Sequence, residues 1–186
     1  EQEDGGLLVR KAGASMPLTF AGAPDSETYL ILQGLDYEGI RPSDGYTEEE
    51  WERLTDYQKN QIRKQDSEWT PPDAATLSVQ GNGVKNISYL NRRHSFYAGI
   101  HDYLVNAGYS AEGLQTITVV FQQAGHYSFD SCSVVCQPVE NLNSYVEDRK
   151  QESLEHVKIG TNRISGEIEL SEAKALCLTI PYSEGW

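Results

Sequence analysis

Hydrophobic and polar residues alternate most regularly between Leu114 and Gln137. Alternation with period two and enrichment in β-branched residues predict strands, and the glycine in the run Gln122 to Gly125 predicts a tight turn between them. We therefore predict a hairpin of two long strands. In its second strand one face is predicted to carry Tyr127, Phe129, Ser131, Ser133 and Val135.

Apolar or alternating runs predict further strands on both sides of this hairpin. Thr28 to Leu35 is nearly all apolar, as expected of a central strand. Glycines at 81 and 83 predict a turn between two strands, and because no helix follows them they do not form a phosphate loop. The other predicted strands are Leu7 to Arg10, Met16 to Phe20, Ala75 to Gln80, Val84 to Leu90, Val157 to Ile159, Ile164 to Leu170 and Ala175 to Ile180. Phe96 to Tyr109 is predicted to hold a strand and then a helical turn over His101 to Val105.

One segment has a helical pattern with a clear start. Thr47 and Glu50 have the spacing of a capping box, and the acidic residues after Thr47 suit the helix dipole. A single helix is predicted from Thr47 to about Gln65, with a narrow stripe of Trp51, Leu54, Gln58 and Ile62. A weaker helical period covers Leu142 to Leu154.

These elements predict an all-β fold: an antiparallel β-sandwich of the jelly-roll or carbohydrate-module kind, with a helical insertion near residues 47–66. We expect a sandwich domain over residues 1–140, with the insertion spanning 47–68. Residues 141–186 hold a linker helix and further strands. They either complete the sandwich or begin a second, truncated β domain.

Charge narrows the range of partners. The 186 residues carry 28 acidic and 15 basic side chains, for a formal charge of -13. This balance argues against a nucleic-acid partner and equally against docking on anionic lipid headgroups. No apolar run is long enough to span a bilayer, and no signal peptide is evident. The chain starts at Glu1 and stops at Trp186 within a strand-like pattern, so we interpret it as a piece of a longer protein.

The cysteine, histidine and acidic residues show no pattern that is typical of a particular catalytic or metal-binding chemistry. Cys132 and Cys136 lie four residues apart on one predicted strand, about 13 Å at the rise of a strand, which is too far for a disulfide. Cys177 pairs with one of them only if its strand lies alongside. The histidines and acids show no metal-ligand spacing, so we predict no metal, no cofactor and no catalytic residue.

Aromatic residues are dense between positions 89 and 109. Their rings could stack on the apolar faces of sugars while their hydroxyl groups bond outward. They could equally pack in the core and its rim. The candidate ligand-binding residues are Tyr89, Phe96, Tyr97, Tyr103 and Tyr109.

Several stretches resemble the YfhO family of bacterial multi-span membrane proteins, over roughly residues 84–186. The most specific is the final run Leu176-Cys177-Leu178-Thr179-Ile180-Pro181-Tyr182-Ser183-Glu184-Gly185-Trp186. The others are Phe96-Tyr97-Ala98-Gly99-Ile100, Asn106-Ala107-Gly108-Tyr109-Ser110, Ile117-Thr118-Val119-Val120-Phe121, Gly125-His126-Tyr127 and Asn162-Arg163-Ile164-Ser165-Gly166.

This resemblance implies a parent that is similar to membrane glycosyltransferases, which use lipid-linked sugars and are linked to the glycosylation of cell-wall polymers. The family's catalytic acids lie in membrane-adjacent loops with no counterpart here, so none is carried over. The chain corresponds to the extracellular β-rich portion, on the outer face of the bacterial cell membrane. The shape-setting residues that match are Gly125, Tyr127, Pro181, Tyr182, Gly185 and Trp186.

Three hypotheses about function follow. The first is a non-catalytic module that positions a cell-surface glycan or polymer acceptor. The second is a structural or protein-interaction ectodomain that supports its own transmembrane region or a partner. The third is an enzyme in its own right. Exposed aromatic residues in a groove favour the first, a flat apolar patch the second, and a buried pair of acids in a cleft the third.

Overall fold

The computed structural model describes residues 2–3, 6–151, 153–161 and 163–174. It is mostly β-structure with few helices. The chain divides into two compact units, Glu1–Val139 and Glu140–Trp186. Each unit is described by itself.

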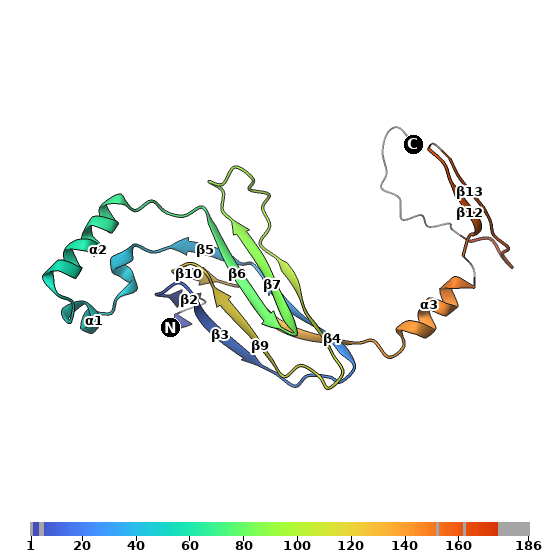
Figure 1. The fold of residues 1–186 in the computed structure, drawn as a ribbon, viewed down its shortest axis with the longest axis horizontal. Helices are drawn as coiled ribbons and strands as arrows, with labels where there is room; N and C mark the ends of the chain where they lie inside the picture. Colours follow the sequence, from blue (N-terminus) through green and yellow to red (C-terminus); the bar gives the residue numbers. More distant parts are fainter. Residues whose placement is uncertain (1, 4–5, 152, 162, 175–186) are drawn as a thin grey trace. The chain divides into compact units, whose positions relative to one another are not determined.

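One layer of the first unit is a four-stranded antiparallel sheet in the order β3-β9-β6-β7 (Figure 1). Its strands are β3 (Ala14–Thr19), β9 (Thr116–Phe121), β6 (Ala74–Gly81) and β7 (Gly83–Leu90). β6 and β7 form a hairpin around Asn82, as the glycines at 81 and 83 predicted. Leu77, Val79 and Val119 lie side by side and fully buried on its inner face.

The opposite layer is built on a long two-stranded ribbon. β4 (Ser26–Gln33) pairs with β11 (Ser131–Pro138), and β5 (Asp36–Gly39) pairs with β10 (Gly125–Ser128). The register is the same on both sides of the break: Gln33 pairs with Ser131 before it, and Asp36 pairs with Ser128 after it. β8 (Tyr103–Ser110) extends the β4 half, while β2 (Gly6–Val9) and β1 (Gln2–Glu3) extend the β10 half.

Both layers contribute to one hydrophobic core. Phe121 of β9 packs against Tyr127 of β10, with ring centroids 4.7 Å apart, and Tyr37 of β5 packs on the other side of Tyr127 at 4.8 Å. The hydroxyl group of Tyr127 donates to the backbone oxygen of Gln123 at 2.9 Å. The predicted all-β, sandwich-like fold is thus confirmed.

The predicted central hairpin is wrong. β9 and β10 do not pair with each other: β9 lies between β3 and β6 in one sheet, and β10 lies between β2 and β5 in another. Residues 122–124 carry the chain from one layer of the sandwich to the other. Period two in a sequence shows that a segment is extended, but it does not identify the strand that pairs with it.

The predicted common face of Tyr127 to Val135 is also wrong, because the inward face changes at the break in the ribbon. Leu30 and Leu32 are buried before the break, whereas Leu35 and Tyr37 are buried after it. Gly34 stands at the change with a φ of +64°, in the region that favours glycine. In the partner strand Tyr127 is buried while Val135 is exposed.

The helical insertion consists of two helices instead of one. α1 (Glu48–Glu52) begins at the Thr47 capping box, and α2 (Asp56–Glu68) begins at a second capping box, in which Thr55 and Gln58 bond each other's backbone. The second cap ends the first helix early, because Thr55 at an N-cap has an extended conformation. Both helices lie between β5 and β6 in sequence, after the short 3-10 turn η1 (Pro42–Gly45), and Ile62 is their buried residue.

Two further predictions concern the rest of the chain. The helical turn predicted over His101 to Val105 is wrong, since residues 91–102 form an irregular loop and β8 starts at Tyr103. In the second unit, a helix was predicted from Leu142 and is present as α3 (Leu142–Lys150). It is followed by the antiparallel pair β12 (Glu155–Ile159) and β13 (Ile164–Glu167). The strand predicted at Ala175 to Ile180, and Cys177 within it, lie outside the described residues.

Candidate binding surface on the three-stranded sheet

The five aromatic residues singled out in the sequence lie in different environments. Tyr89, at the end of β7, is 2 % exposed, and its hydroxyl group donates to Oδ1 of Asp36 at 2.5 Å. Burial and this carboxylate raise the pKa of Tyr89 well above its usual value. Its ring belongs to the core and has no open face for a ligand.

Tyr97 is half-buried beside His101. Nδ1 of His101 lies 2.9 Å from the backbone oxygen of Leu35, and Nε2 lies 3.4 Å from the Tyr97 hydroxyl group. Because a carbonyl oxygen only accepts, Nδ1 carries the hydrogen, so in the neutral ring Nε2 accepts from Tyr97. This contact ties the loop between β7 and β8 to the chain between β4 and β5.

Tyr103 also holds this loop in place. Its hydroxyl group donates to the backbone oxygens of Ser88 and Ile100, at 3.2 and 3.3 Å. Burial raises the pKa of Tyr103. Of the five candidates, Phe96 and Tyr109 present their rings to solvent, with 78 % and 43 % exposure. They stand on different elements, Phe96 on the loop and Tyr109 near the end of β8.

Tyr109 belongs to a group of side chains on the outer face of the sheet β11-β4-β8. Strand register places Tyr109 beside Glu27 and places Asn106 beside Tyr29. The Tyr29 hydroxyl group and the Asn106 amide donate to the same Glu27 oxygen, Oε2, at 2.8 and 2.5 Å. The Tyr109 hydroxyl group donates to Asp25 at 2.7 Å. These hydrogen bonds to carboxylates raise the pKa values of Tyr29 and Tyr109.

The arrangement has the chemistry of a carbohydrate subsite. Glu27 is fixed by two donors at Oε2, and Oε1 has no protein partner among the described residues. An oriented carboxylate accepts hydrogen bonds from sugar hydroxyl groups, and phenol rings pack on the apolar face of a sugar ring. Glu27 is the one charged side chain among the outward positions of the three strands, so this face suits neutral or amine-bearing sugars better than anionic ones.

The middle of the same face carries aliphatic side chains. Ile31 lies between Leu104 of β8 and Ser133 of β11. Leu104 is 69 % exposed, and Val135, the neighbour of Tyr29 on β11, is 45 % exposed. Beyond them, Gln33 of β4 and Ser131 of β11 are polar again, so the aliphatic side chains form a patch in the middle of the face.

Sequence reasoning missed Glu27, Tyr29 and Asn106. The prediction that Thr28 to Leu35 is a central strand is confirmed, since β4 lies between β11 and β8, but before Gly34 only the even positions of β4 are buried. Tyr29 alternates with buried Thr28 and Leu30, and Glu27 precedes the predicted strand by one residue. If the predicted strand is extended back to Ser26, its sequence pattern indicates a polar and aromatic outer face on an otherwise apolar strand.

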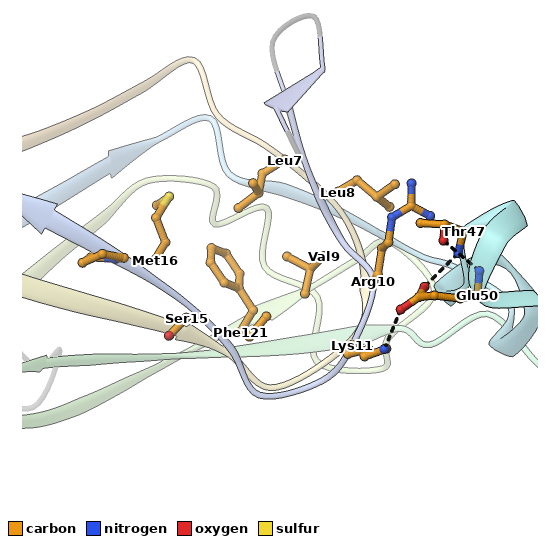
Figure 2. Close-up of a pocket in the computed structure, with 12 residues that line it drawn as sticks. Leu7, Leu8, Val9, Arg10, Lys11, Ser15, Met16, Thr47, Glu50 and Phe121 are labelled. Atoms are coloured by element: carbon orange, nitrogen blue, oxygen red, sulfur yellow. Dashed lines mark hydrogen bonds and ion pairs between the residues drawn. The ribbon is translucent and has the colours of Figure 1, made fainter. Parts of the chain in front are cut away.

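A cavity of about 510 Å³ lies elsewhere in the first unit, between β2 and β3 (Figure 2). Leu7, Val9, Met16 and Phe121 give it an apolar wall, and Arg10, Lys11, Thr47 and Glu50 line its polar end. Nζ of Lys11 lies 3.2 Å from Oε1 of Glu50. The backbone N–H of Thr47, and then Lys11, lower the pKa of Glu50, so this end of the cavity holds an ion pair at neutral pH.

The described part of the chain contains no group of three or more histidine, cysteine or acidic side chains that could hold a metal ion. Cys132 and Cys136 are free thiols, and the pair that either could form with Cys177 lies outside what the structure describes. No helix within the described ranges is long and apolar enough to cross a membrane.

The fold and the outer face define the class of this protein as a β-sandwich with a solvent-facing polar and aromatic surface. A family model described as bacterial membrane protein YfhO matches residues 54–186, and the chain belongs to this family. No match was found among curated proteins or among solved structures. β8 and β11 of the outer face lie within the matched residues. The cavity is lined, except for Phe121, by residues that precede them.

Proposed function

We propose that this chain is a non-catalytic, extracytoplasmic part of a YfhO-family membrane protein and that it positions a cell-surface glycan or polymer acceptor. Any sugar transfer then takes place in the membrane part of a glycosyltransferase-like parent, and the sandwich supplies the binding surface. Family membership supports the association with a membrane. We further propose that the ligand is a glycan, that the sandwich lies on the outer side of the membrane, and that it binds while the transmembrane region of the full-length protein catalyses.

The observation that carries this proposal is the group Glu27, Tyr29, Asn106 and Tyr109. Rigid strands position all four side chains, and hydrogen bonds to the carboxylates of Glu27 and Asp25 hold three of them. Sites on strands are more precise than sites on loops. A sugar stacked on one or two rings gains little free energy, so we expect dissociation constants in the millimolar range, about -4 kcal/mol.

The test is an NMR titration of the chain with neutral, amine-bearing and anionic oligosaccharides, chosen from a glycan-array screen. We expect the amide signals of β4, β8 and β11 to shift with neutral or amine-bearing sugars. Tyr29→Ala should abolish these shifts. Tyr57→Ala is the matched control, because Tyr57 is an exposed tyrosine on α2, far from this sheet in the fold. No shift with any sugar, or equal loss in both variants, contradicts the proposal.

A second candidate function is a protein-interaction or structural ectodomain without a ligand of its own. The aliphatic patch in the middle of the face, with Leu104, Ile31 and Val135, favours it, because an exposed apolar patch often marks a protein contact. Analytical ultracentrifugation separates the two candidates. The second function is supported if the unmutated chain self-associates, if Leu104→Ser weakens this self-association, and if the unmutated chain shows no response to sugars.

A further inference from the structure

The loop between β7 and β8, residues 91–102, combines positive charge with exposed apolar side chains. Arg92 and Arg93 are exposed at its start, and Phe96 and Ile100 are 78 % and 55 % exposed further along. No acidic residue occurs between positions 91 and 101 of a chain whose formal charge is -13. Figure 1 shows this loop extending past the end of β7.

The loop is held by its own contacts, so the exposure of Phe96 and Ile100 is built into the fold. Asn91 donates through its backbone to Asp73 and through its side chain to Pro72, at 2.9 and 3.2 Å. The backbone N–H of Phe96 donates to Nδ1 of His94 at 3.1 Å. At the far end, the bonds of His101 to Leu35 close the loop. Tyr97 and Tyr103, described above, brace it from inside.

We propose that this loop docks on the surface of an anionic lipid bilayer. Phe96 and Ile100 enter the boundary between headgroups and acyl chains, and Arg92 and Arg93 lie against lipid phosphates. Arginine suits this place because its planar guanidinium group bonds phosphate oxygens in pairs. The chain belongs to a membrane protein family, so a lipid surface is present wherever the intact protein is.

The acidic surface of the chain does not prevent such a contact. At physiological ionic strength, charges more than about 8 Å apart are largely screened. The acids near the loop keep their negative charge: Asp102, its last residue, accepts from the backbone N–H of Gly34 at 2.9 Å, and Asp36 accepts from Tyr89. Asp73, at the base of the loop, is exposed and remains as a local negative charge. Because the two arginines do not outnumber these three acids, the exposed side chains of Phe96 and Ile100 carry the larger share of the proposed contact.

Vesicle co-sedimentation tests the proposal with the 186-residue chain. We expect binding to vesicles that contain phosphatidylglycerol and much weaker binding to vesicles of phosphatidylcholine alone, with a loss of binding as salt rises. Arg92→Gln should weaken binding about fivefold, since each cation near an anionic surface contributes about that much. Phe96→Ser should weaken it about tenfold through lost apolar insertion.

The matched control variants each remove an exposed apolar side chain or an exposed cation that lies outside the loop. Val84→Ser deletes an apolar side chain that is 61 % exposed at the other end of β7, and Arg63→Gln deletes an exposed cation on α2. Both should bind vesicles like the parent chain. Circular dichroism checks that every variant is folded. Three results overturn the proposal: no vesicle binding, equal binding to both kinds of vesicle, or controls that lose as much as the loop variants. It is also overturned if Phe96→Ser abolishes self-association instead of lipid binding, because the loop then contacts protein.

Discussion

Two groups of aromatic residues in the same layer of the sandwich have opposite environments. Tyr37 and Tyr127, on β5 and β10, face inward, pack on each other and are at most 4 % exposed, and Tyr127 also packs on Phe121. Tyr29, on β4, and Tyr109, beside it on β8, face outward, and their hydroxyl groups bond to carboxylates. The ribbon therefore provides the centre of the core at one end and, together with β8, a candidate binding surface at the other.

The difference between the two groups arises at Gly34. Before it even-numbered residues face the core, and after it odd-numbered residues do. Had the alternation continued unchanged, either Tyr29 would be buried or Tyr37 would be exposed. A local change in backbone conformation thus decides which tyrosines build the core and which face solvent.

The largest expected effect is the removal of a core ring. Tyr127→Ala should lower the free energy of unfolding by about 4 kcal/mol, because a large aromatic side chain leaves a cavity between the two layers. Tyr109→Ala should cost less than about 1 kcal/mol, since its ring is 43 % exposed. Urea denaturation of both variants measures the difference. Equal losses would show that the outward tyrosines also support the core, and would end the contrast drawn between the two groups.

Much of the fold follows from local pattern. The β6-β7 hairpin, the start of the helical insertion at Thr47 and the β-rich class were all predicted, because turn glycines, a capping box and period two act within a few residues. The pairing of β9 and β10 with other strands was not predicted. Pairing depends on contacts between residues far apart in sequence, such as Tyr127 with Leu7 and Tyr37, which no local pattern records.

The candidate surface was predictable only in part. Tyr109 was among the candidate residues, but its neighbours Glu27 and Tyr29 come from a strand about 80 positions earlier, and register alone joins them. Tyr89 was selected for the same reason as Tyr109, namely aromatic density. Composition does not distinguish a residue at the core end of β7 from one on the outer face of β8.

The second prediction changes the residue where the facing changes. Gly34→Ala should destabilise the chain by about 2 kcal/mol or more, because alanine is strained at a φ of +64° and its methyl group would overlap the Asp130 carboxylate. Gly13→Ala is the matched control. Gly13 has a φ of +81° with nothing within 4 Å of an added methyl group, so it measures the backbone strain alone, about 1 kcal/mol.

Thermal and urea unfolding of both glycine variants separate the two contributions. We expect Gly34→Ala to cost clearly more than Gly13→Ala, and the Asp130→Gly change to recover part of the excess. If both glycine variants lose the same stability, the overlap with Asp130 is relieved by a small movement, and Gly34 matters only for its φ.

The smallest expected effect concerns Tyr89. This residue is buried like the core tyrosines, but its hydroxyl group bonds to a carboxylate like those of the outer tyrosines. Tyr89→Phe should lower stability at neutral pH by about 1.5 kcal/mol, the usual value of a hydrogen bond to a charged group. The ring stays in place, so the core packing should be unchanged.

Alkaline pH sharpens this last test. The pKa of Tyr89 is raised in the folded chain above the ordinary 10.0, chiefly by burial. The folded state therefore keeps the Tyr89 proton where the unfolded state loses it. The stabilisation is fully present below pH 10.0 and is lost as pH rises through the folded pKa. We expect the stability difference between the parent chain and Tyr89→Phe to shrink above pH 10.0 in urea titrations. Tyr57→Phe, at an exposed tyrosine, should show no such convergence. A difference that stays constant with pH would mean that the Tyr89 hydroxyl group ionises as readily in the folded chain as in the unfolded one.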